Sequence, residues 1–371
     1  MKSISVFGLG LAAVAGFCGA VYAPVHAQGN APFDPPPANS TSPASALDDM
    51  PSRTISNGII SAKVYLPEKF GFYRATRFDH AGMITHVTYK GHDYGRYWFA
   101  KTSPNVRNFT YDSDGVVAHN NNVAAGPVEE FGENGFEAAG PCPEGAQKTK
   151  CGRFLKIGVG ILKRDNDTYN RFHTYPILNA GTRTTRATAN SIRFTQVVSG
   201  DPSGYGYSHT KIVTMVPGKA QMTIEVRLKN TGSKAIDTTV YNHHFTTLSP
   251  GNEAIELVAP FNLTNVRPMP SDVIKFEGPR MSYLRAIKGQ EQIASDLTGY
   301  GGSASDNDFR ITNTKTGYGV RLRADLPIAR LLWWSIPSTL SLEPYMAIQL
   351  KPGEEKRWTH TLDYYGPGDA T

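Results

Sequence analysis

Two segments each carry one ionisable side chain in apolar surroundings. His243 lies in VYNHHFTTL, residues 240–248, and Glu343 lies in LSLEPYMAIQL, residues 340–350. A histidine and a carboxylate that face one cleft can donate and accept protons, so the two residues are candidates for a general acid and a general base. The competing interpretation is structural, because a single histidine in an apolar strand is more often a core or edge residue, whereas an unpaired buried carboxylate is costly and therefore rarer.

Both segments are expected to be strands, because aromatic and β-branched residues dominate them and no helical spacing of apolar residues appears. Side chains alternate along a strand, so only one of His243 and His244 can point into the cleft. The spacing to Leu248 favours His243. We keep His244 as a candidate for substrate binding.

Asn-His at 242–243 followed by Leu248, with a later Leu-Glu-Pro at 342–344 running into LKPGEEKRWTHTLDY, resembles the galactose mutarotase-like (aldose 1-epimerase) superfamily. The resemblance covers the second half of the chain best. It implies that His243 protonates the sugar ring oxygen and that Glu343 takes the proton of the anomeric hydroxyl, without a cofactor. The family's His-Gly-Gly segment before the catalytic histidine is absent, which leaves the identity of the sugar open.

Further candidates for binding a sugar lie upstream. Arg77 belongs to FYRATRFDHAGMITHVTYKG, residues 72–91, which resembles the opening turn of the family. Arg171 and His173 lie in the aromatic segment YNRFHTYPI, residues 169–177, and could replace the family's second sugar-contacting histidine. A guanidinium group makes directional hydrogen bonds to oxygen acceptors. A salt-bridged turn is the alternative for the residues around Arg77.

Trp333 and its neighbour Trp334 shortly precede the Glu-Pro segment. Adjacent strand residues face opposite ways, so one indole can stack on a sugar face while the other packs inward. We name Trp333 as the binding candidate.

The loop GPVEEFGENGFEAAGP, residues 126–141, carries four glutamates. Several carboxylates on a glycine-containing loop could hold calcium, but no regular ligand spacing is present, so a solvated acidic loop is the preferred interpretation. We expect no metal and no cofactor. The glutamates are Glu129, Glu130, Glu133 and Glu137.

The first 27 residues combine a lysine, a short apolar run and small residues at the end, which predicts a signal peptide cut before Gln28. Residues 28–54 are rich in Pro, Ser and Ala and predict a flexible linker. Cys142 and Cys151 remain after cleavage, and in an oxidising compartment such a pair predicts a disulfide. We therefore expect a secreted or periplasmic protein that is not inserted in a membrane.

Residues 55–371 are expected to form a single domain, because no second linker-like boundary follows. Many strand-like runs separated by turn residues predict an all-β fold, a large antiparallel β-sandwich. The resemblance implies the same class, a β-supersandwich. The runs are 59–67, 83–90, 154–163, 192–198 and 211–216, followed by MTIEVRL, TTVYNHHFTTL, GVRLRADL, RLLWWSI and RWTHTLDYY.

The net charge of +6 is spread along the chain without a basic run, so nucleic acid is not expected as a partner. We expect a monomer that acts on a sugar or oligosaccharide as an aldose 1-epimerase-like enzyme. One alternative is a carbohydrate-binding protein without activity. The other is a polysaccharide lyase or hydrolase, in which Tyr241, Arg77 and Arg171 would serve a uronate-directed lyase.

Overall fold

The computed structural model describes residues 42–43, 50–68, 72–99, 101–103, 109–112, 115–119, 125–139 and 152–369. The chain divides into two units, 1–38 and 39–371, and all described residues belong to the second. The predicted signal peptide, most of the predicted linker, Cys142 and Cys151 lie outside the described residues. Strand β2 (Ser52–Ser56) begins within the range predicted as linker, since it pairs with β3 (Ser61–Tyr65).

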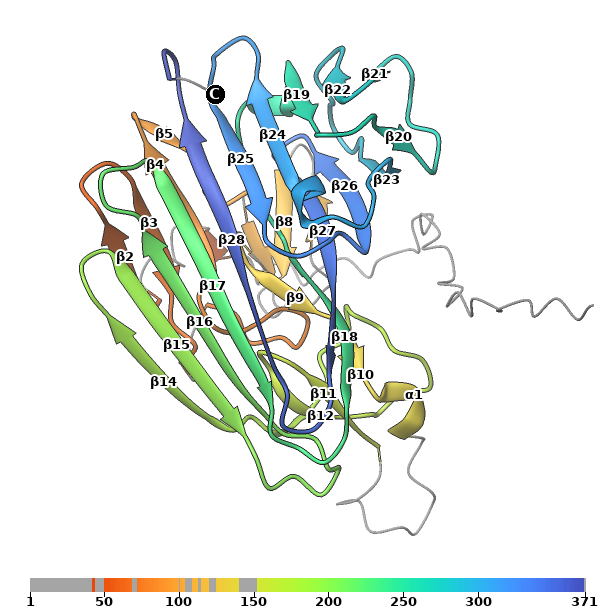
Figure 1. The fold of residues 1–371 in the computed structure, drawn as a ribbon. Helices are drawn as coiled ribbons and strands as arrows, with labels where there is room; N and C mark the ends of the chain where they lie inside the picture. Colours follow the sequence, from red (N-terminus) through yellow and green to blue (C-terminus); the bar gives the residue numbers. More distant parts are fainter. Residues whose placement is uncertain are drawn as a thin grey trace, which may run out of the picture. The chain divides into compact units, whose positions relative to one another are not determined.

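The prediction of an all-β, antiparallel fold is confirmed, and every strand pair but one in the described part of the chain is antiparallel (Figure 1). Two large sheets dominate. The ten-stranded sheet has the order β14 (Thr182–Ala187), β15 (Ser191–Val198), β16 (Tyr207–Met215), β17 (Gln221–Asn230), β28 (Glu355–Tyr365), β25 (Gly319–Ala324), β24 (Asp308–Asn313), β19 (Ile255–Val258), β22 (Arg280–Tyr283) and β21 (Ile274–Glu277). The six-stranded sheet has the order β20 (Thr264–Asn265), β23 (Ile293–Thr298), β26 (Arg330–Ile336), β27 (Thr339–Leu350), β18 (Ile236–Asn242) and β9 (Glu129–Phe131).

Three smaller sheets complete the strands. One joins β2 and β3 to β4 (Ile84–Tyr89) and β5 (His92–Asp93); another joins β10 (Glu133–Asn134), β11 (Arg153–Lys156), β12 (Gly160–Lys163) and β13 (Ile177–Asn179); the third joins β1 (Ser42–Pro43), β6 (Lys101–Ser103), β8 (Gly115–His119) and β7 (Phe109–Asp112). In the part of the chain that is described, the one α-helix is α1 (Phe136–Ala139), and no helix has the length and apolar character that a membrane span requires.

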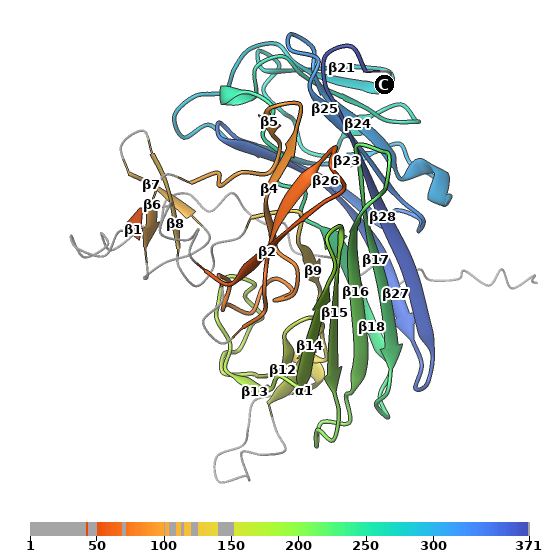
Figure 2. The same ribbon diagram turned by 90° about the vertical axis from the view of Figure 1, so that its left-hand side faces the viewer.

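The main core lies between the two large sheets. Strands β14 to β17 and β28 run side by side (Figure 2). Alternate side chains of β17 and β28 turn inward, and Trp358 meets Phe131 of the six-stranded sheet with ring centroids 6.2 Å apart. Leu342 and Met346 of β27 belong to the same apolar cluster. Burying each such side chain contributes about 1.5 to 3 kcal/mol, so these inward rows fix which face of each sheet is left for the site.

The run 154–163 was expected to be one strand, and this prediction is wrong. Residues 153–163 form a hairpin, β11 and β12, because the chain turns at Gly158 with a φ of 80°. A side chain at Gly158 would meet Asp79, with its Cβ 2.6 Å from the carboxylate. Gly158, which the sequence analysis placed within one strand, therefore forms the turn between two strands.

Candidate active site

His243 lies one residue beyond the end of β18 and faces Glu343 on the neighbouring strand β27, so the segment 240–248, predicted to be a strand, is one only as far as Asn242. Strand β18 pairs with β27 as far as Val240 opposite Met346, and a bridge beyond the end of β18 keeps the same register. The strands are antiparallel, so counting three residues forward from Val240 and three residues back from Met346 brings His243 opposite Glu343. The distance from His243 Nε2 to Glu343 Oε1 is 3.2 Å, and both side chains are about 5% exposed or less. The structure thus brings together the two predicted acid–base residues.

Aromatic rings hold the imidazole in place. Phe245 stacks on His243 with centroids 3.7 Å apart and planes 18° apart. Phe78 and Trp334 meet the same ring edge-on, at 5.7 Å and 6.1 Å. Such packing restricts the ring to an orientation that points Nε2 at Glu343. Its Nδ1 has no hydrogen-bond partner within the described residues.

Glu343 is a carboxyl group whose proton is lost near neutral pH. Burial raises the pKa of Glu343 to about 7, although the nearby Arg171 and Arg77 act to lower it. The hydroxyl of Tyr345 donates a hydrogen bond of 3.2 Å to Oε2. A base with a pKa near the working pH is well suited to proton transfer.

Burial pushes the pKa of His243 in the opposite direction, well below 6.5, and Arg77 lowers it further. In the free protein the pair therefore holds its single proton mainly on Glu343 at and below neutral pH. The two groups are in contact, so the proton can pass to His243 without any change in the total number bound. This transfer gives the arrangement that the sequence analysis predicted, in which His243 is protonated and Glu343 is ionised.

A buried carboxylate, Glu130, organises the cations beside the pair. Arg77 Nε donates to Glu130 Oε2 at 2.7 Å, Arg171 Nη2 lies 2.6 Å from Oε1, and the Tyr241 hydroxyl donates to Oε2 at 2.5 Å. Lys156 Nζ is 3.8 Å from Oε1. Burial alone would raise the pKa of Glu130, but Arg171 and Arg77 hold it far below its usual range. Glu130 therefore remains ionised and positions both arginines.

Backbone contacts explain how distant segments meet at this point. Strand β9 pairs with the outer edge of β18, placing Glu130 opposite Tyr241. The hydroxyl of Tyr73 accepts hydrogen bonds of 3.0 Å from the backbone N–H groups of Arg77 and Phe78. These bonds fix the turn that aims the Arg77 side chain at β9.

Two predicted binding residues lie elsewhere. Trp333 is fully buried on the opposite face of β26 from the pair, and its Nε1 donates to the hydroxyl of Tyr283 at 2.9 Å. The prediction that Trp333 lines the site is therefore wrong, and it is the neighbouring Trp334 whose indole meets the His243 ring. His173 Nε2 lies 3.0 Å from Asp165 Oδ1 with 40% of the His173 side chain exposed, and the structure shows no contact between it and the pair.

His244 points into the core, where its ring lies 6.0 Å from that of His360. The choice of His243 over His244 agrees with this arrangement, because just past the end of β18 the two imidazoles still point to opposite sides, one to Phe245 and the other to His360. His244 is therefore removed from the sugar-binding candidates.

The prediction that residues 126–141 form a solvated acidic loop is wrong for two of the four glutamates. Glu129 and Glu130 lie in β9 and are 1% and 3% exposed, because each carboxylate has cations from distant segments as partners. Glu130, which binds both arginines, and Tyr345, which donates to Glu343, were not among the site residues expected from the sequence, and Tyr241 was named only for the lyase alternative. The one available signal was the apolar flank of the glutamate pair, Val128 and Phe131. Within the described part of the chain, no group of three or more His, Cys, Asp or Glu side chains is arranged to hold a metal ion.

Comparison with known proteins found no matching family model and no matching curated protein. Among solved structures, the chain is similar to the GalM/aldose epimerase homologue from C. elegans, with 12% identity and a TM-score of 0.49 over 85% of this chain and 99% of that one. It is also similar to a galactose mutarotase-like protein from Clostridium acetobutylicum, with 9% identity and a TM-score of 0.48 over 88% and 98% of the two chains. A third is a galactose mutarotase-like protein from Lactobacillus casei, with 11% identity and a TM-score of 0.46 over 85% and 100%. These likenesses leave the activity of the chain open.

Proposed function

We propose that this chain is an aldose 1-epimerase-like enzyme that interconverts sugar anomers through His243 and Glu343. The observation that carries the proposal is the 3.2 Å contact between His243 Nε2 and Glu343 Oε1, made by two buried groups. Ring opening of an aldose needs one group to take a proton from the anomeric hydroxyl and another to give a proton to the ring oxygen. A pair that holds one proton supplies both functions.

The steps balance as follows. Glu343, ionised, removes the proton of the anomeric hydroxyl while protonated His243 donates to the ring oxygen. The bond between the anomeric carbon and the ring oxygen breaks, and an open-chain aldehyde forms. Rotation about the adjoining carbon–carbon bond presents the other face of the aldehyde. Reclosure runs the two transfers backwards, so the pair ends with the single proton it began with.

The neighbouring residues suit a polar ligand with apolar faces. Arg171 is the most exposed of the three groups that contact Glu130 at close range, with 31% of its side chain accessible, and its guanidinium can reach a hydroxyl from solvent. Trp334, half-buried beside His243, offers an indole edge at the same place. Together they would orient the sugar over the acid–base pair.

The alternatives are less well supported. A protein that only binds carbohydrate would be favoured by a wide separation of His243 and Glu343, which are in contact. A lyase would use Tyr241 as base with Arg77 and Arg171 against a uronate, and the three do meet. However, burial raises the pKa of Tyr241 well above 10, and its hydroxyl donates to Glu130, so it is poorly placed to remove a proton.

The test is anomer exchange measured by saturation transfer between α and β signals of hexoses, pentoses and uronic acids. The wild type should exceed the buffer rate with at least one sugar. Glu343→Gln keeps the shape and removes the base, and should lower the rate by about 10²-fold or more. Glu225→Gln, at an exposed position on β17, is the matched control and should exchange at the wild-type rate.

Exchange at the buffer rate with every sugar would overturn the proposal. Release of new reducing ends from a polysaccharide would instead support the lyase or hydrolase alternative. A secreted or periplasmic location and a disulfide between Cys142 and Cys151 stay predictions from the sequence.

A further inference from the structure

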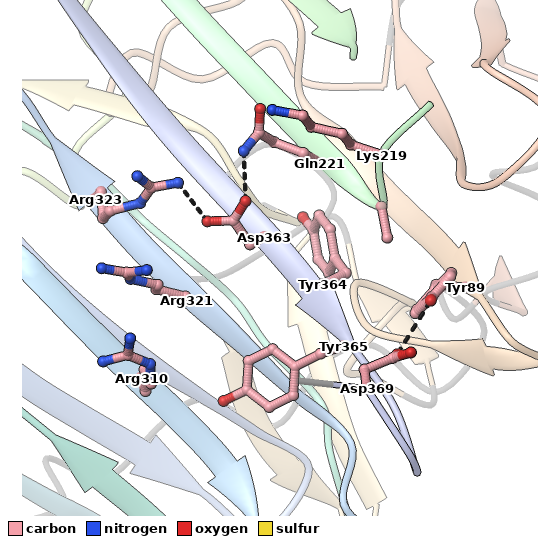
Figure 3. Close-up of a pocket in the computed structure, with 11 residues that line it drawn as sticks. Tyr89, Lys219, Gln221, Arg310, Arg321, Arg323, Asp363, Tyr364, Tyr365 and Asp369 are labelled. Atoms are coloured by element: carbon pink, nitrogen blue, oxygen red, sulfur yellow. Dashed lines mark hydrogen bonds and ion pairs between the residues drawn. The ribbon is translucent and has the colours of Figure 1, made fainter. Parts of the chain in front are cut away.

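A second candidate site lies on the ten-stranded sheet, away from the strands that carry His243 and Glu343. It is a partly open pocket of about 400 Å³ whose floor is formed by neighbouring strands β24, β25, β28 and β17 (Figure 3). Pockets that hold small ligands have volumes of about 300 to 1,000 Å³, so a single sugar-sized molecule fits here. The lining residues that matter below are Arg310, Arg321, Arg323, Lys219, Gln221 and Asp363.

The arginines reach this face because side chains alternate along the strands. On β25, Val320 and Leu322 are buried in the core, so Arg321 and Arg323 point to the outer face. Arg310 on β24 is directly opposite Arg321 in the strand register. Adjacent strands are about 4.8 Å apart, so the three guanidinium groups form one basic row, as Figure 3 shows.

Two of the three arginines are neutralised. Arg321 makes a bidentate pair with Asp308, with N–O distances of 2.7 Å and 2.5 Å. Arg323 Nη2 donates to Asp363 Oδ2 at 2.5 Å. These pairs hold Arg321 and Arg323 in position, and they engage the carboxylates of Asp308 and Asp363.

Arg310 differs from its neighbours, because among the described residues its side chain makes no hydrogen bond and no close ion pair, and its charge acts only at longer range, on Asp308 and Tyr365. It is half-buried, so its charge is only partly hydrated. Lys219 adds an exposed ammonium group at the rim. The carboxylate of Asp369, which also lines the pocket, pairs with Lys90. Five cations, Arg310, Arg321, Arg323, Lys219 and Lys90, against three carboxylates, Asp308, Asp363 and Asp369, leave two positive charges without a matching carboxylate. Such an excess favours an anionic ligand.

Neutral hydrogen-bonding groups also line the pocket, although Gln221 on β17 lies three strands, or about 14 Å of backbone spacing, from Arg310 on β24. Gln221 Nε2 donates to Asp363 Oδ1 at 2.5 Å, which leaves the amide oxygen of Gln221 as an acceptor. Tyr365 also lines the pocket next to Arg310. A bare inorganic anion would use the cations alone, whereas a ligand that also carries hydroxyl groups would use these as well.

We propose that this pocket binds a sugar acid, with the carboxylate on Arg310 and ring hydroxyls on Asp363, which lies between Arg310 and Gln221 in the strand order. The proposal does not depend on the activity proposed for His243 and Glu343. It adds a non-catalytic site for an anionic sugar on the other large sheet of the molecule.

The test uses the whole protein with ¹⁵N-labelled arginine, so that each guanidinium Nε–H signal reports on its own site. The Arg310 signal is assigned by its loss in Arg310→Gln. The probes are glucuronate, glucose and inorganic phosphate. We expect glucuronate to shift the Arg310 signal saturably, glucose to leave it in place, and phosphate to bind about tenfold more weakly than glucuronate. One charge-assisted hydrogen bond accounts for a factor of this size.

Matched variants complete the test. Arg310→Gln should weaken glucuronate binding at this pocket about tenfold, measured by the shift of the remaining Arg321 and Arg323 signals. Arg193→Gln, an exposed arginine on β15 of the same sheet, should leave the affinity unchanged. An Arg310 signal that glucuronate does not move, or equal affinity in Arg310→Gln, would overturn the proposal. Phosphate binding as tight as glucuronate binding would overturn the sugar acid assignment and leave a general oxyanion site.

Discussion

Glu129 and Glu130 are neighbours on β9, yet their carboxylates lie on opposite faces of the six-stranded sheet and contact separate cations. Glu130 binds Arg77 and Arg171 beside the acid–base pair. Glu129 contacts Lys211 in the core between the sheets, and Lys211 Nζ also lies 2.7 Å from Asp79 Oδ2. Because the Asp79 backbone N–H donates to the carbonyl of Glu129 at 2.9 Å, the core cluster also ties the turn that carries Arg77 to β9.

Replacing Lys211 with methionine should destabilise the fold strongly. Burial would raise the pKa of Asp79, and Lys211 is the main group that lowers it again, so its loss leaves two buried carboxylates without their cation. Breaking a buried ion pair from one side costs about 3 to 5 kcal/mol, measurable by urea unfolding. Lys229→Met, at an exposed position on β17, is the control and should change stability by less than about 0.5 kcal/mol. If the Lys211→Met protein were as stable as the control, the ion pairs of Lys211 with Asp79 and Glu129 would not be what stabilises the fold at this point.

The rate of anomer exchange should fall as the pH rises above about 7. The pair needs its one proton, and the pKa of Glu343 is about 7, so at higher pH the pair is empty and cannot protonate the ring oxygen. With His243 shifted well below 6.5, a second proton binds only in more acidic solution. The value of kcat/KM should therefore be level just below neutrality and drop about tenfold per pH unit above it. A rate that keeps rising to pH 9 would contradict the one-proton mechanism.

Glu343 should also make stability depend on pH. Its pKa is about 7 in the folded protein and near 4.5 when unfolded, so between these values the folded state holds more protons. Stability from this group then decreases as the pH rises through that window. The glutamine in Glu343→Gln cannot ionise, so this variant does not lose stability as the pH rises through the window. The unfolding free energy of Glu343→Gln minus that of the wild type should grow from about pH 4.5 to about pH 7, and a constant difference would refute the raised pKa.

His243→Asn and Glu343→Gln should not have additive effects on exchange. Each variant alone removes one member of a pair in contact at 3.2 Å, which in the proposed mechanism works with a single proton. The double variant should therefore lose far less than the product of the two losses. Saturation transfer under identical conditions measures all three proteins. Full multiplication of the two losses would mean that the residues act independently.

The two neighbouring tryptophans should separate stability from substrate binding. Trp333 is fully buried and bonded to Tyr283, so Trp333→Ala should cost about 3 to 5 kcal/mol of stability. Trp334 is half-buried beside His243, so Trp334→Ala should mainly raise KM or lower kcat of a folded protein. Thermal unfolding and exchange kinetics on the same samples would decide. The reverse pattern would restore Trp333 as the binding residue.

The sequence by itself determined the class of fold, because β-branched and aromatic runs with alternating burial are a local property of each strand. The strand containing Glu343 is an example, and β27 spans Thr339–Leu350 as the run predicted. It also supplied His243 and Glu343, since both were out of character in apolar segments. The hairpin at Gly158 was missed, because two short strands and one long strand have the same local composition.

Only the tertiary structure decided which side chains share the site. Glu130 meets Arg77 and Arg171, which are 53 and 41 residues away in the chain, and no local pattern encodes such contacts. The choice between Trp333 and Trp334, like that between His243 and His244, depends on which face of a strand the opposite sheet covers. Local sequence gives the alternation of side chains, whereas long-range packing decides which of the two faces is buried in the core.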